Sequence, residues 1–561
     1  MTRHFHFADL FELAADKVPN RIALHDDTRS VTYGELEARA NRLAHVLQAS
    51  GVKAHDHVAV YAKNCIEWAE SIFAIYKIRG SIVNVNYRYV EDELRYLLDN
   101  SDAVACIYQH EYEPLLVKAG DSQPKLTTFI RIDDASNAPV LIEAAQNYNE
   151  ALAAASDGRD FDERSDDDVY LLYTGGTTGM PKGVMWRMED VFYALGGGVD
   201  IFTNEKATRP EALVNKINAD APQGLIALQV APFMHGAGQF GLMRMLFEGN
   251  TAVVMEQFDA ERVWRRVHEL RVNSVGFTGD AMARPLADVY ERIKGEIDIT
   301  CLFAFSSTAA VFSQSLKDYF RRELPEHTTM MDAIGSTETG MNGYRMVTAG
   351  DDSKMGITTV NAGLDSVVLD DDLVPMPPGT GKIGKLARGG NIPLGYYNDP
   401  EKTAETFITD ATGNRWSIPG DFARVEDDGR ITLLGRGSVS INSGGEKIFP
   451  EEVEQALKAH PEVFDVLVVG IPDDRWGETV CAVVQARQGT SPSLEGISET
   501  ARTRIAGYKV PRRMFVIAEI PRHANGKPDY RRGKEIAVAL AAGDPSASPS
   551  ANGGDRSTTV S

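Results

Sequence analysis

The first hundred residues alternate between short apolar stretches and segments of helical periodicity, and this rhythm limits the fold most. Thr32 and Glu35 form a capping-box pair ahead of a helix that ends at Gly51. The pattern then predicts strands at 58–62, 82–85 and 104–107 and helices at 66–79 and 91–98. Because strands that alternate with helices build parallel sheets covered by helices, we predict an α/β fold with mostly parallel sheets in a large N-terminal domain.

The pattern changes after Arg436. Short strands at 466–469, 481–485 and 514–517 flank helices at 451–459 and 499–505, which indicates a small C-terminal α+β domain. A chain of 561 residues also exceeds what one hydrophobic core usually organises. We therefore predict a large domain at 1–435 and a small domain at 439–540. The residues from 541 to 561 lack the apolar side chains needed for a core, and we expect a disordered tail.

Charge and cysteine content narrow the range of functions. A net charge of −22 argues against a nucleic-acid partner, although a local cradle of N–H groups can still bind a small anion. The four cysteines are scattered without metal-ligand spacing, which fits a reducing compartment. We find no signal peptide and no apolar run long enough to span a membrane, so we expect a soluble, cytoplasmic protein.

The strongest local motif is YTGGTTGMPKG at residues 173–183, directly after a predicted strand. Glycines let backbone N–H groups approach phosphate oxygens, while threonine hydroxyls and a lysine add donors and charge. The candidate phosphate-binding residues are Thr174, Gly175, Gly176, Thr177, Thr178, Gly179 and Lys182. A flexible surface turn is the alternative. The segment is not a Walker loop, because Gly183 stands where a magnesium-binding Ser or Thr belongs.

This segment resembles the signature loop of the adenylate-forming superfamily, which includes acyl-CoA synthetases, luciferases and the adenylation domains of peptide synthetases. Further motifs follow in the family's order over nearly the whole chain. The stretches YLLYTGGTTG, FTGDAMARPL and GRGSVSINSGGEK are most similar to actinobacterial acyl-CoA synthetases of steroid side-chain degradation. The resemblance implies a mobile C-terminal domain, ATP, coenzyme A and a carboxylic acid as substrates, Mg²⁺ as cofactor, and a homodimer at the level of the family.

The resemblance assigns two further segments to nucleotide binding. In DAIGSTE at 332–338, Thr337 would bond the α-phosphate and Glu338 would hold Mg²⁺, with Ile334 at a position where the family usually has an aromatic residue that stacks on adenine. A helix cap is the alternative for the Ser-Thr-Glu triplet. The other implied nucleotide-binding residues are Ser307, Thr308 and Ala309 in SSTAA, and Asp332, Gly335 and Ser336.

Asp421 and Arg436 resemble the family's ribose-binding pair, although an Asp after Gly is also a common turn residue. Arg436 opens the implied hinge at 436–438. At the central hinge position the family usually has Asp or Lys, and this chain has Ser438. A small polar residue can also absorb a backbone rotation.

Two segments of the C-terminal domain resemble the parts that act on coenzyme A and on the carboxylate. Gly444, Gly445 and Lys447 belong to a loop that would approach the pantetheine arm, or to an ordinary β-turn. Lys527 follows the family's Pro-x₄-Gly pattern and would neutralise charge as the carboxylate attacks the α-phosphate.

The acyl pocket is indicated least strongly. His235 matches a histidine beside the pocket in the family, while a structural role is the alternative. Gly197 and Gly198 follow a helical stretch, and they either open space for a bulky acyl group or end the helix. The polar segment at 200–223 is predicted to be an insertion or a lid.

Together these residues predict an ATP-dependent acyl-CoA synthetase that forms an acyl-adenylate and then a thioester. We rank a steroid side-chain carboxylate slightly above a long-chain fatty acid. One alternative is an acyl-AMP ligase that loads a carrier protein, or an amino-acid adenylating domain. The other is an inactive nucleotide-binding regulatory protein.

Overall fold

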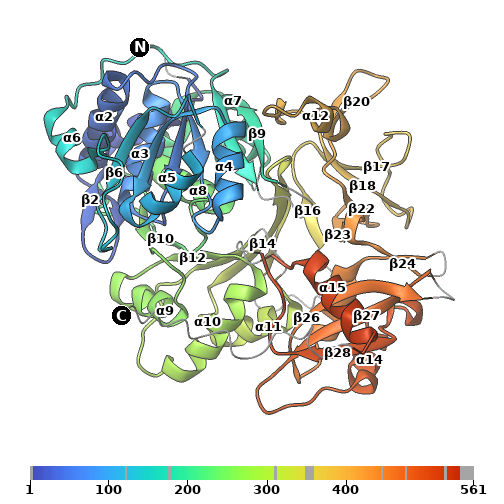
Figure 1. Cartoon of the computed structure of the whole chain (residues 1–561). Coiled ribbons are helices and arrows are strands. Elements are labelled where there is room, and N and C mark those ends of the chain that lie inside the picture. The colour runs from blue at the N-terminus through green and yellow to red at the C-terminus, as the bar shows by residue number, and fades with distance from the viewer. Residues whose placement is uncertain are drawn as a thin grey trace.

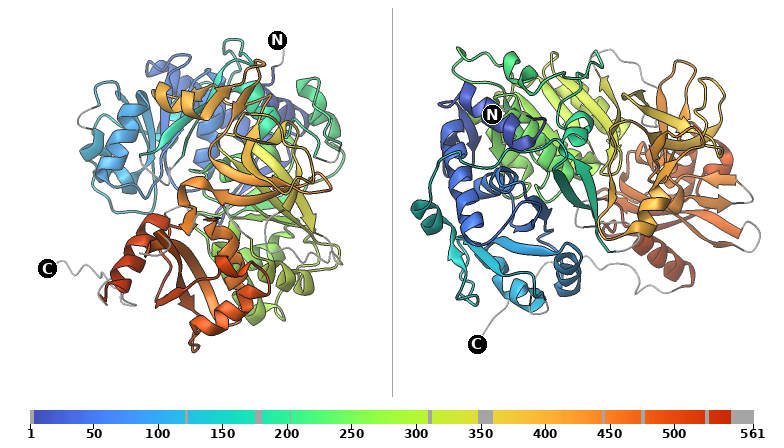
Figure 2. Two further views of the ribbon diagram at one scale, coloured as in Figure 1. Left: turned by 90° about the vertical axis from the view of Figure 1, so that its right-hand side faces the viewer. Right: turned by 90° about the horizontal axis from the view of Figure 1, so that it is seen from above.

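The computed structural model describes residues 4–120, 123–174, 180–201, 203–308, 312–347, 359–443, 446–473, 477–523 and 527–543. Its strands form four sheets within these residues. We call residues 4–436 the body and residues 441–543 the C-terminal lobe. Figure 1 shows the lobe in orange and red beside the green helices of the body, and the left view of Figure 2 shows it below the blue N-terminal layers.

The predicted rhythm of the first hundred residues is confirmed. Thr32 and Glu35 form both hydrogen bonds of a capping box at the start of α2 (Tyr33–Ala49). A parallel sheet follows in the order β4-β3-β5-β6-β7. Its elements are β3 (His57–Tyr61), α3 (Ile66–Lys77), β4 (Ser81–Asn84), α4 (Glu91–Asn100), β5 (Ala103–Gln109), β6 (Thr128–Ile132) and β7 (Gln146–Asn147).

The largest sheet joins a parallel half to an antiparallel half. Parallel pairing connects β11 (Thr251–Val254), β10 (Ile226–Gln229), β12 (Ser274–Phe277), β13 (Ala304–Ser307) and β14 (Thr329–Ser336). From β14 the pairing turns antiparallel through β15 (Gly340–Val347), β16 (Thr359–Ala362), β23 (Ile431–Arg436) and β22 (Asp421–Val425). The carboxyl ends of parallel strands meet at one edge, so β12, β13 and β14 deliver their following loops to the same place.

A smaller antiparallel sheet carries the predicted phosphate loop. In it β8 (Val169–Thr174) pairs with β9 (Lys182–Arg187), and Thr174 lies opposite Lys182. Gly175, Gly176, Thr177, Thr178 and Gly179 lie outside the described residues. Because Thr174 and Lys182 pair across the hairpin, the two ends of the loop lie side by side.

The C-terminal lobe is a mixed sheet with helices packed on it, as predicted. Two apolar clusters lie on its faces, one with α13 and α14 and the other with α15. The helix α14 (Leu494–Arg502) begins and ends earlier than the helix predicted at 499–505, because Ser493 caps it. The elements are β24 (Ile441–Ser443), β25 (Glu446–Ile448), α13 (Pro450–Lys458), β26 (Val463–Asp473), β27 (Gly477–Ala486), α14 (Leu494–Arg502), β28 (Arg513–Ile517) and α15 (Tyr530–Ala541).

The polar segment at 200–223 is anchored to the body. Leu213, Val214 and Ile217 belong to the main apolar cluster. The Arg21 guanidinium donates to the carbonyls of Asn218 and Ala221 at 2.7 and 2.9 Å. This anchoring favours a fixed insertion over a freely moving lid. Among the helices of the described ranges, none is long and apolar enough to cross a membrane.

A buried ion network ties the N-terminal helix α1 (Phe7–Lys17) to α2 and α3. Lys77 is fully buried, and its Nζ lies 2.6 Å from Glu12 and 2.8 Å from Glu37. Arg164 contacts Glu12 as well, at 2.6 Å. Burial alone would raise the pKa of the Glu12 carboxyl, but Lys77 and Arg164 together lower it well below its usual range. The network therefore holds the Glu12 carboxylate ionised inside the body.

We expect Lys77→Met to destabilise the protein by about 3 kcal/mol, because two buried carboxylates lose a shared counter-charge. Urea unfolding measures this. Lys125→Met is the matched control, since its 2.7 Å pair with Asp102 lies at the surface with Lys125 62% exposed. That change should stay within about 0.5 kcal/mol. Equal losses in the two variants would contradict the assignment of a structural role to the network.

Candidate active site

The turn after β14 presents Thr337 and Glu338 at the edge of the large sheet. The Trp186 indole donates to the Thr337 carbonyl at 3.1 Å, and the Ser417 hydroxyl donates to the Glu338 carbonyl at 2.7 Å. Tyr396 donates its hydroxyl to Glu338 Oε1 at 3.0 Å. Because these bonds fix the backbone and one carboxylate oxygen, both side chains are held in place while they remain partly exposed.

Gly335 is required by the same turn. A Cβ added there would lie 2.2 Å from the carbonyl oxygen of Gly340, which is closer than any side chain tolerates. The strand register also shifts between Ile334 and Gly335. The glycine in this motif therefore allows the β14–β15 turn to close tightly beneath Thr337 and Glu338.

Asp421 and Arg436 lie opposite each other on the antiparallel strands β22 and β23. Arg436 Nε donates to Asp421 Oδ1 at 3.2 Å. The Asp421 carboxylate is the main cause of the raised pKa of Arg436. The sequence motifs that suggested this pair are thus brought together by strand pairing.

Lys527 reaches the same place from the C-terminal lobe. Burial lowers the pKa of its ammonium group and the charge of Arg436 lowers it further, while Glu338 and Asp421 act in the opposite direction. The electrostatic influence of these three groups on the ammonium indicates that Lys527, Glu338, Asp421 and Arg436 lie near one another, where the lobe meets the body.

His235 lies directly before α8 (Gly236–Phe247), within the electrostatic influence of Lys527. Burial lowers the pKa of its imidazole to about 4, and the charges of Lys527 and Arg88 contribute. The ring is therefore neutral near pH 7. Its buried Nε2 has no hydrogen-bond partner in the part of the chain that the structure describes.

Asn84, at the end of β4, links the phosphate loop to the His235 segment. Its amide nitrogen donates to the carbonyls of Tyr173 and Met234 at 2.8 and 2.7 Å, and its oxygen accepts from the Tyr173 N–H at 2.8 Å. Lys182 forms an ion pair with Asp399 and lies over the Tyr396 ring. Neither Asn84 nor Tyr396 is among the site residues predicted from the sequence.

Several predicted nucleotide-binding residues have internal partners. The Ser307 hydroxyl accepts a hydrogen bond from the Gly279 N–H at 3.0 Å and is buried, while Thr308 is exposed. Asp332 pairs with Lys317, and burial raises the pKa of the Asp332 carboxyl. Ile334 belongs to an apolar cluster with Val360 and its neighbours. Ser336 exchanges hydrogen bonds with Thr339, and Ala309 lies outside the described residues.

The glycines after α7 (Met188–Ala194) end that helix. The Gly198 N–H donates to the Phe192 carbonyl at 3.0 Å, and a Cβ at Gly198 would lie 2.6 Å from the Phe192 ring. Gly197 adopts a left-handed φ of 90°. These contacts favour helix termination over the opening of an acyl pocket.

The candidate hinge and coenzyme A loop lie where β23 leads into β24. Ser438 lies in a short 3₁₀ turn, η4 (Gly437–Val439), and the backbone of Lys447 pairs with Asn442. Gly444 and Gly445 lie outside the described residues. The predicted boundary therefore coincides with a turn between two sheets.

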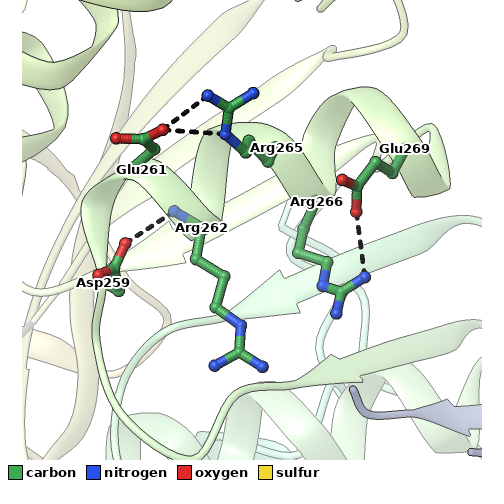
Figure 3. A pocket seen from close by; sticks show the side chains of 6 residues that line it. All are labelled: Asp259, Glu261, Arg262, Arg265, Arg266 and Glu269. Carbon is green, nitrogen blue, oxygen red and sulfur yellow. Dashed lines mark hydrogen bonds and ion pairs between the residues drawn. The ribbon is translucent and has the colours of Figure 1, made fainter. Parts of the chain in front are cut away.

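A separate groove on α9 (Ala260–Leu270) is lined by charged side chains (Figure 3). Glu261 accepts from Arg265 at 2.7 and 2.9 Å, and Glu269 accepts from Arg266 at 3.1 Å. Because its acids and bases already pair with one another, we assign no ligand to this groove.

A model of the AMP-binding enzyme family matches residues 11–397, and a model of the AMP-binding enzyme C-terminal domain matches residues 452–527. The chain belongs to the AMP-binding enzyme family. This confirms the adenylate-forming resemblance drawn from the motifs.

The relatives are similar over nearly their whole length. The chain is 49% identical over 534 residues to 3-oxocholest-4-en-26-oate–CoA ligase of Rhodococcus rhodochrous, covering 94% of this chain and 95% of the relative. It is 48% identical over 550 residues to medium/long-chain-fatty-acid–CoA/3-oxocholest-4-en-26-oate–CoA ligase of Mycobacterium tuberculosis, covering 98% and 99%. The anthranilate CoA ligase AuaEII in complex with anthranoyl-AMP matches with a TM-score of 0.81 at 22% identity, covering 97% and 99%, which supports the fold.

The lowered pKa of Lys527 predicts a pH dependence. Because the ammonium loses its proton below lysine's ordinary value of 10.5, kcat/KM for acid-dependent pyrophosphate release should fall as pH rises through that lowered pKa. Lys527→Arg keeps its charge over the whole range, so its remaining activity should lack this decline. Identical alkaline profiles of the two proteins would exclude Lys527 as the titrating group.

Proposed function

We propose that this chain is an ATP-dependent acyl-CoA synthetase of the AMP-forming type. The observation that carries the proposal is that Lys527 from the lobe is influenced by the charges of Glu338 and of the Asp421–Arg436 pair in the body. Asn84 also ties the phosphate-loop hairpin to the segment that carries His235. Family membership and relatives named as CoA ligases support the same reaction.

In the first step a carboxylate oxygen would attack the α-phosphorus of ATP, and the bond to pyrophosphate would break. The carboxylate is thereby converted into a mixed anhydride whose leaving group is AMP. We assign to Asp421 and Arg436 the ribose, to Thr337 the α-phosphate, and to Lys182 with the loop the outer phosphates. Lys527 would place its positive charge against the oxygens that gain negative charge in the transition state.

The fit of Mg²⁺ to this site rests on Glu338. Its partly exposed carboxylate accepts one hydrogen bond from Tyr396 and keeps further lone pairs for an ion. Among the described residues, no group of three or more His, Cys, Asp or Glu side chains could hold a metal alone. A single carboxylate suits an ion held mainly by phosphate and water oxygens. Glu338 would hold Mg²⁺ there, and the ion would neutralise part of the phosphate charge.

In the second step the thiol of coenzyme A would attack the acyl carbon, its proton would pass to solvent, and the bond to AMP would break. Lys527 and the segment at 443–447 both belong to the lobe, so we propose that the lobe turns between the two steps and exchanges one for the other. We propose that the turn at 436–438, with Ser438 at its centre, is the hinge. Gly444, Gly445 and Lys447 would then accompany the pantetheine arm.

For the acid, we propose a steroid side-chain carboxylate ahead of a long-chain fatty acid, because the relatives' names include 3-oxocholest-4-en-26-oate and fatty acids. His235, with its neutral ring and unpaired Nε2, is the proposed pocket residue. The roles of Gly197 and Gly198 in that pocket, the homodimer and the cytoplasmic location stay predictions.

The test is ATP-dependent AMP formation with Mg²⁺ and a panel of steroid side-chain acids, fatty acids and amino acids, with and without coenzyme A. We expect a coenzyme A thioester from a steroid acid. Acyl-adenylate that accumulates without transfer would indicate a carrier-loading ligase instead. Absence of acid-dependent pyrophosphate release across the panel would favour a nucleotide-binding regulatory protein.

Lys527→Ala separates the two steps. We expect adenylation to fall by on the order of 10²-fold or more, because the transition state loses a preorganised charge. Thioester formation from supplied acyl-adenylate should remain within about twofold of wild type. Stopped-flow or quench-flow measurement of each half-reaction decides this, and an equal loss in both would refute the assignment.

A further inference from the structure

A buried ion pair crosses the seam between the body and the C-terminal lobe. Lys458 Nζ, at the end of α13, lies 3.2 Å from Asp280 Oδ2 on α10 (Gly279–Ile293), and each side chain is only 8% exposed. Figure 1 shows α10, in green, on the side of the body that the lobe faces. Nearby, the Arg284 guanidinium of the same helix lies 5.4 Å from the Phe464 ring centre. The docked orientation of the lobe is thus marked by a specific charged contact.

On the lobe side, two further ion pairs connect Lys458 to the ladder that carries Lys527. Lys458 Nζ also lies 3.2 Å from Asp465 Oδ1, and Asp465 accepts from the Arg522 guanidinium. Burial alone would raise the pKa of Asp465, but Lys458 and Arg522 lower it to about 2. Asp465 is therefore ionised at neutral pH, and its two ion pairs link α13 and β26 to Arg522.

Arg522 and Lys527 lie on the two arms of one short ladder. Arg522 pairs with Pro528 in an antiparallel bridge, and the His523 N–H donates to the Lys527 carbonyl at 2.8 Å. Successive side chains in a ladder point to opposite faces. Arg522 therefore turns toward Asp465, and Lys527 lies on the opposite face of the ladder.

On the body side, Asp280 is fixed to the candidate nucleotide site. Asp280 Oδ1 accepts from the Ser313 N–H at 2.7 Å, and the adjacent Gly279 N–H donates to Ser307. Asp280, which pairs with Lys458, therefore lies at the same edge of the sheet as Ser307 of the predicted nucleotide-binding segment.

We propose that Lys458 is a positioning residue for adenylation: by pairing with Asp280 it docks the lobe, and through Asp465 and Arg522 it positions the short ladder that carries Lys527 near Glu338, Asp421 and Arg436. This inference rests on the proposed role of Lys527. When the lobe turns for the second step, Lys458 leaves Asp280 but keeps Asp465, because Asp465 moves with it. The pair therefore favours only the first orientation, and a contact made in one of two states shifts the balance between them.

The test measures both half-reactions in Lys458→Gln. We expect adenylation to fall by on the order of tenfold to hundredfold, since Asp280 is left buried without its counter-charge. Thioester formation from supplied acyl-adenylate should change by less than about threefold. Lys458→Arg, which keeps the charge, should recover most of the adenylation rate.

Two further variants make the result specific. Asp280→Asn keeps an oxygen for the Ser313 N–H, leaves the lobe intact and removes only the charge opposite Lys458, so it should reproduce the same split. Lys509→Gln is the matched control, because Lys509 pairs at 2.6 Å with Glu452 of α13 without crossing the seam. It should leave both half-reactions within about twofold.

Equal losses in both half-reactions of Asp280→Asn, or adenylation at the wild-type rate in that variant, would overturn the proposal even if Lys458→Gln folds poorly. Lys527→Ala, assayed in parallel, tests the function itself. If Lys527→Ala separates the steps while Asp280→Asn does not, the positioning network fails and the proposed function stands. If Lys527→Ala impairs both steps equally, the assignment of Lys527 to the first step is refuted.

Discussion

The buried ammonium group of Lys527 comes from the lobe, while the charged groups that act on it come from the body. An ammonium group beside the Arg436 guanidinium would be unfavourable alone, and its lowered pKa reflects that cost. Asp421 and Glu338 offset the repulsion, so charges of both signs surround the ammonium group. Arg436 and Asp421 lie on paired strands of the large sheet, and Glu338 lies in a turn of the same sheet, whereas the lysine comes from the lobe.

The two halves of the large sheet supply different parts of the site. Parallel strands end together at one edge, which places the loops after β12, β13 and β14 beside one another. Antiparallel strands instead place residues directly opposite each other, and this produces the Asp421–Arg436 pair. The change of direction at β14 therefore lies between the candidate phosphate and ribose contacts, where Gly335 and Gly340 form the tight turn.

Where the body meets the lobe, ionisable side chains pack against the constrained backbone of Gly435. Glu451, in the first turn of α13, packs against Gly435, whose φ is 133° and where a Cβ would lie 2.2 Å from the carboxylate. Burial raises the pKa of Glu451 to about 8, with Glu454 contributing, so this carboxyl is mostly neutral at pH 7. Buried charged contacts add little net stability but distinguish one arrangement from another. Contacts of this kind can favour one orientation of the lobe without adding much to its stability.

Much of this protein was predictable from local pattern. The α/β fold was predicted from the capping box at Thr32 and Glu35 and from the alternation of strands and helices. The family was recognised from the order of the motifs. Both kinds of signal depend on residues that are close together in the chain. The sequence also named Lys527, Glu338, Asp421 and Arg436 individually. It did not reveal Asn84, Tyr396 or the Asp280–Lys458 pair, and it placed Ser307 and Asp332 at the nucleotide without their internal partners. Those contacts join residues far apart in the chain, and only the packing of sheets and lobe decides which charges and amides meet.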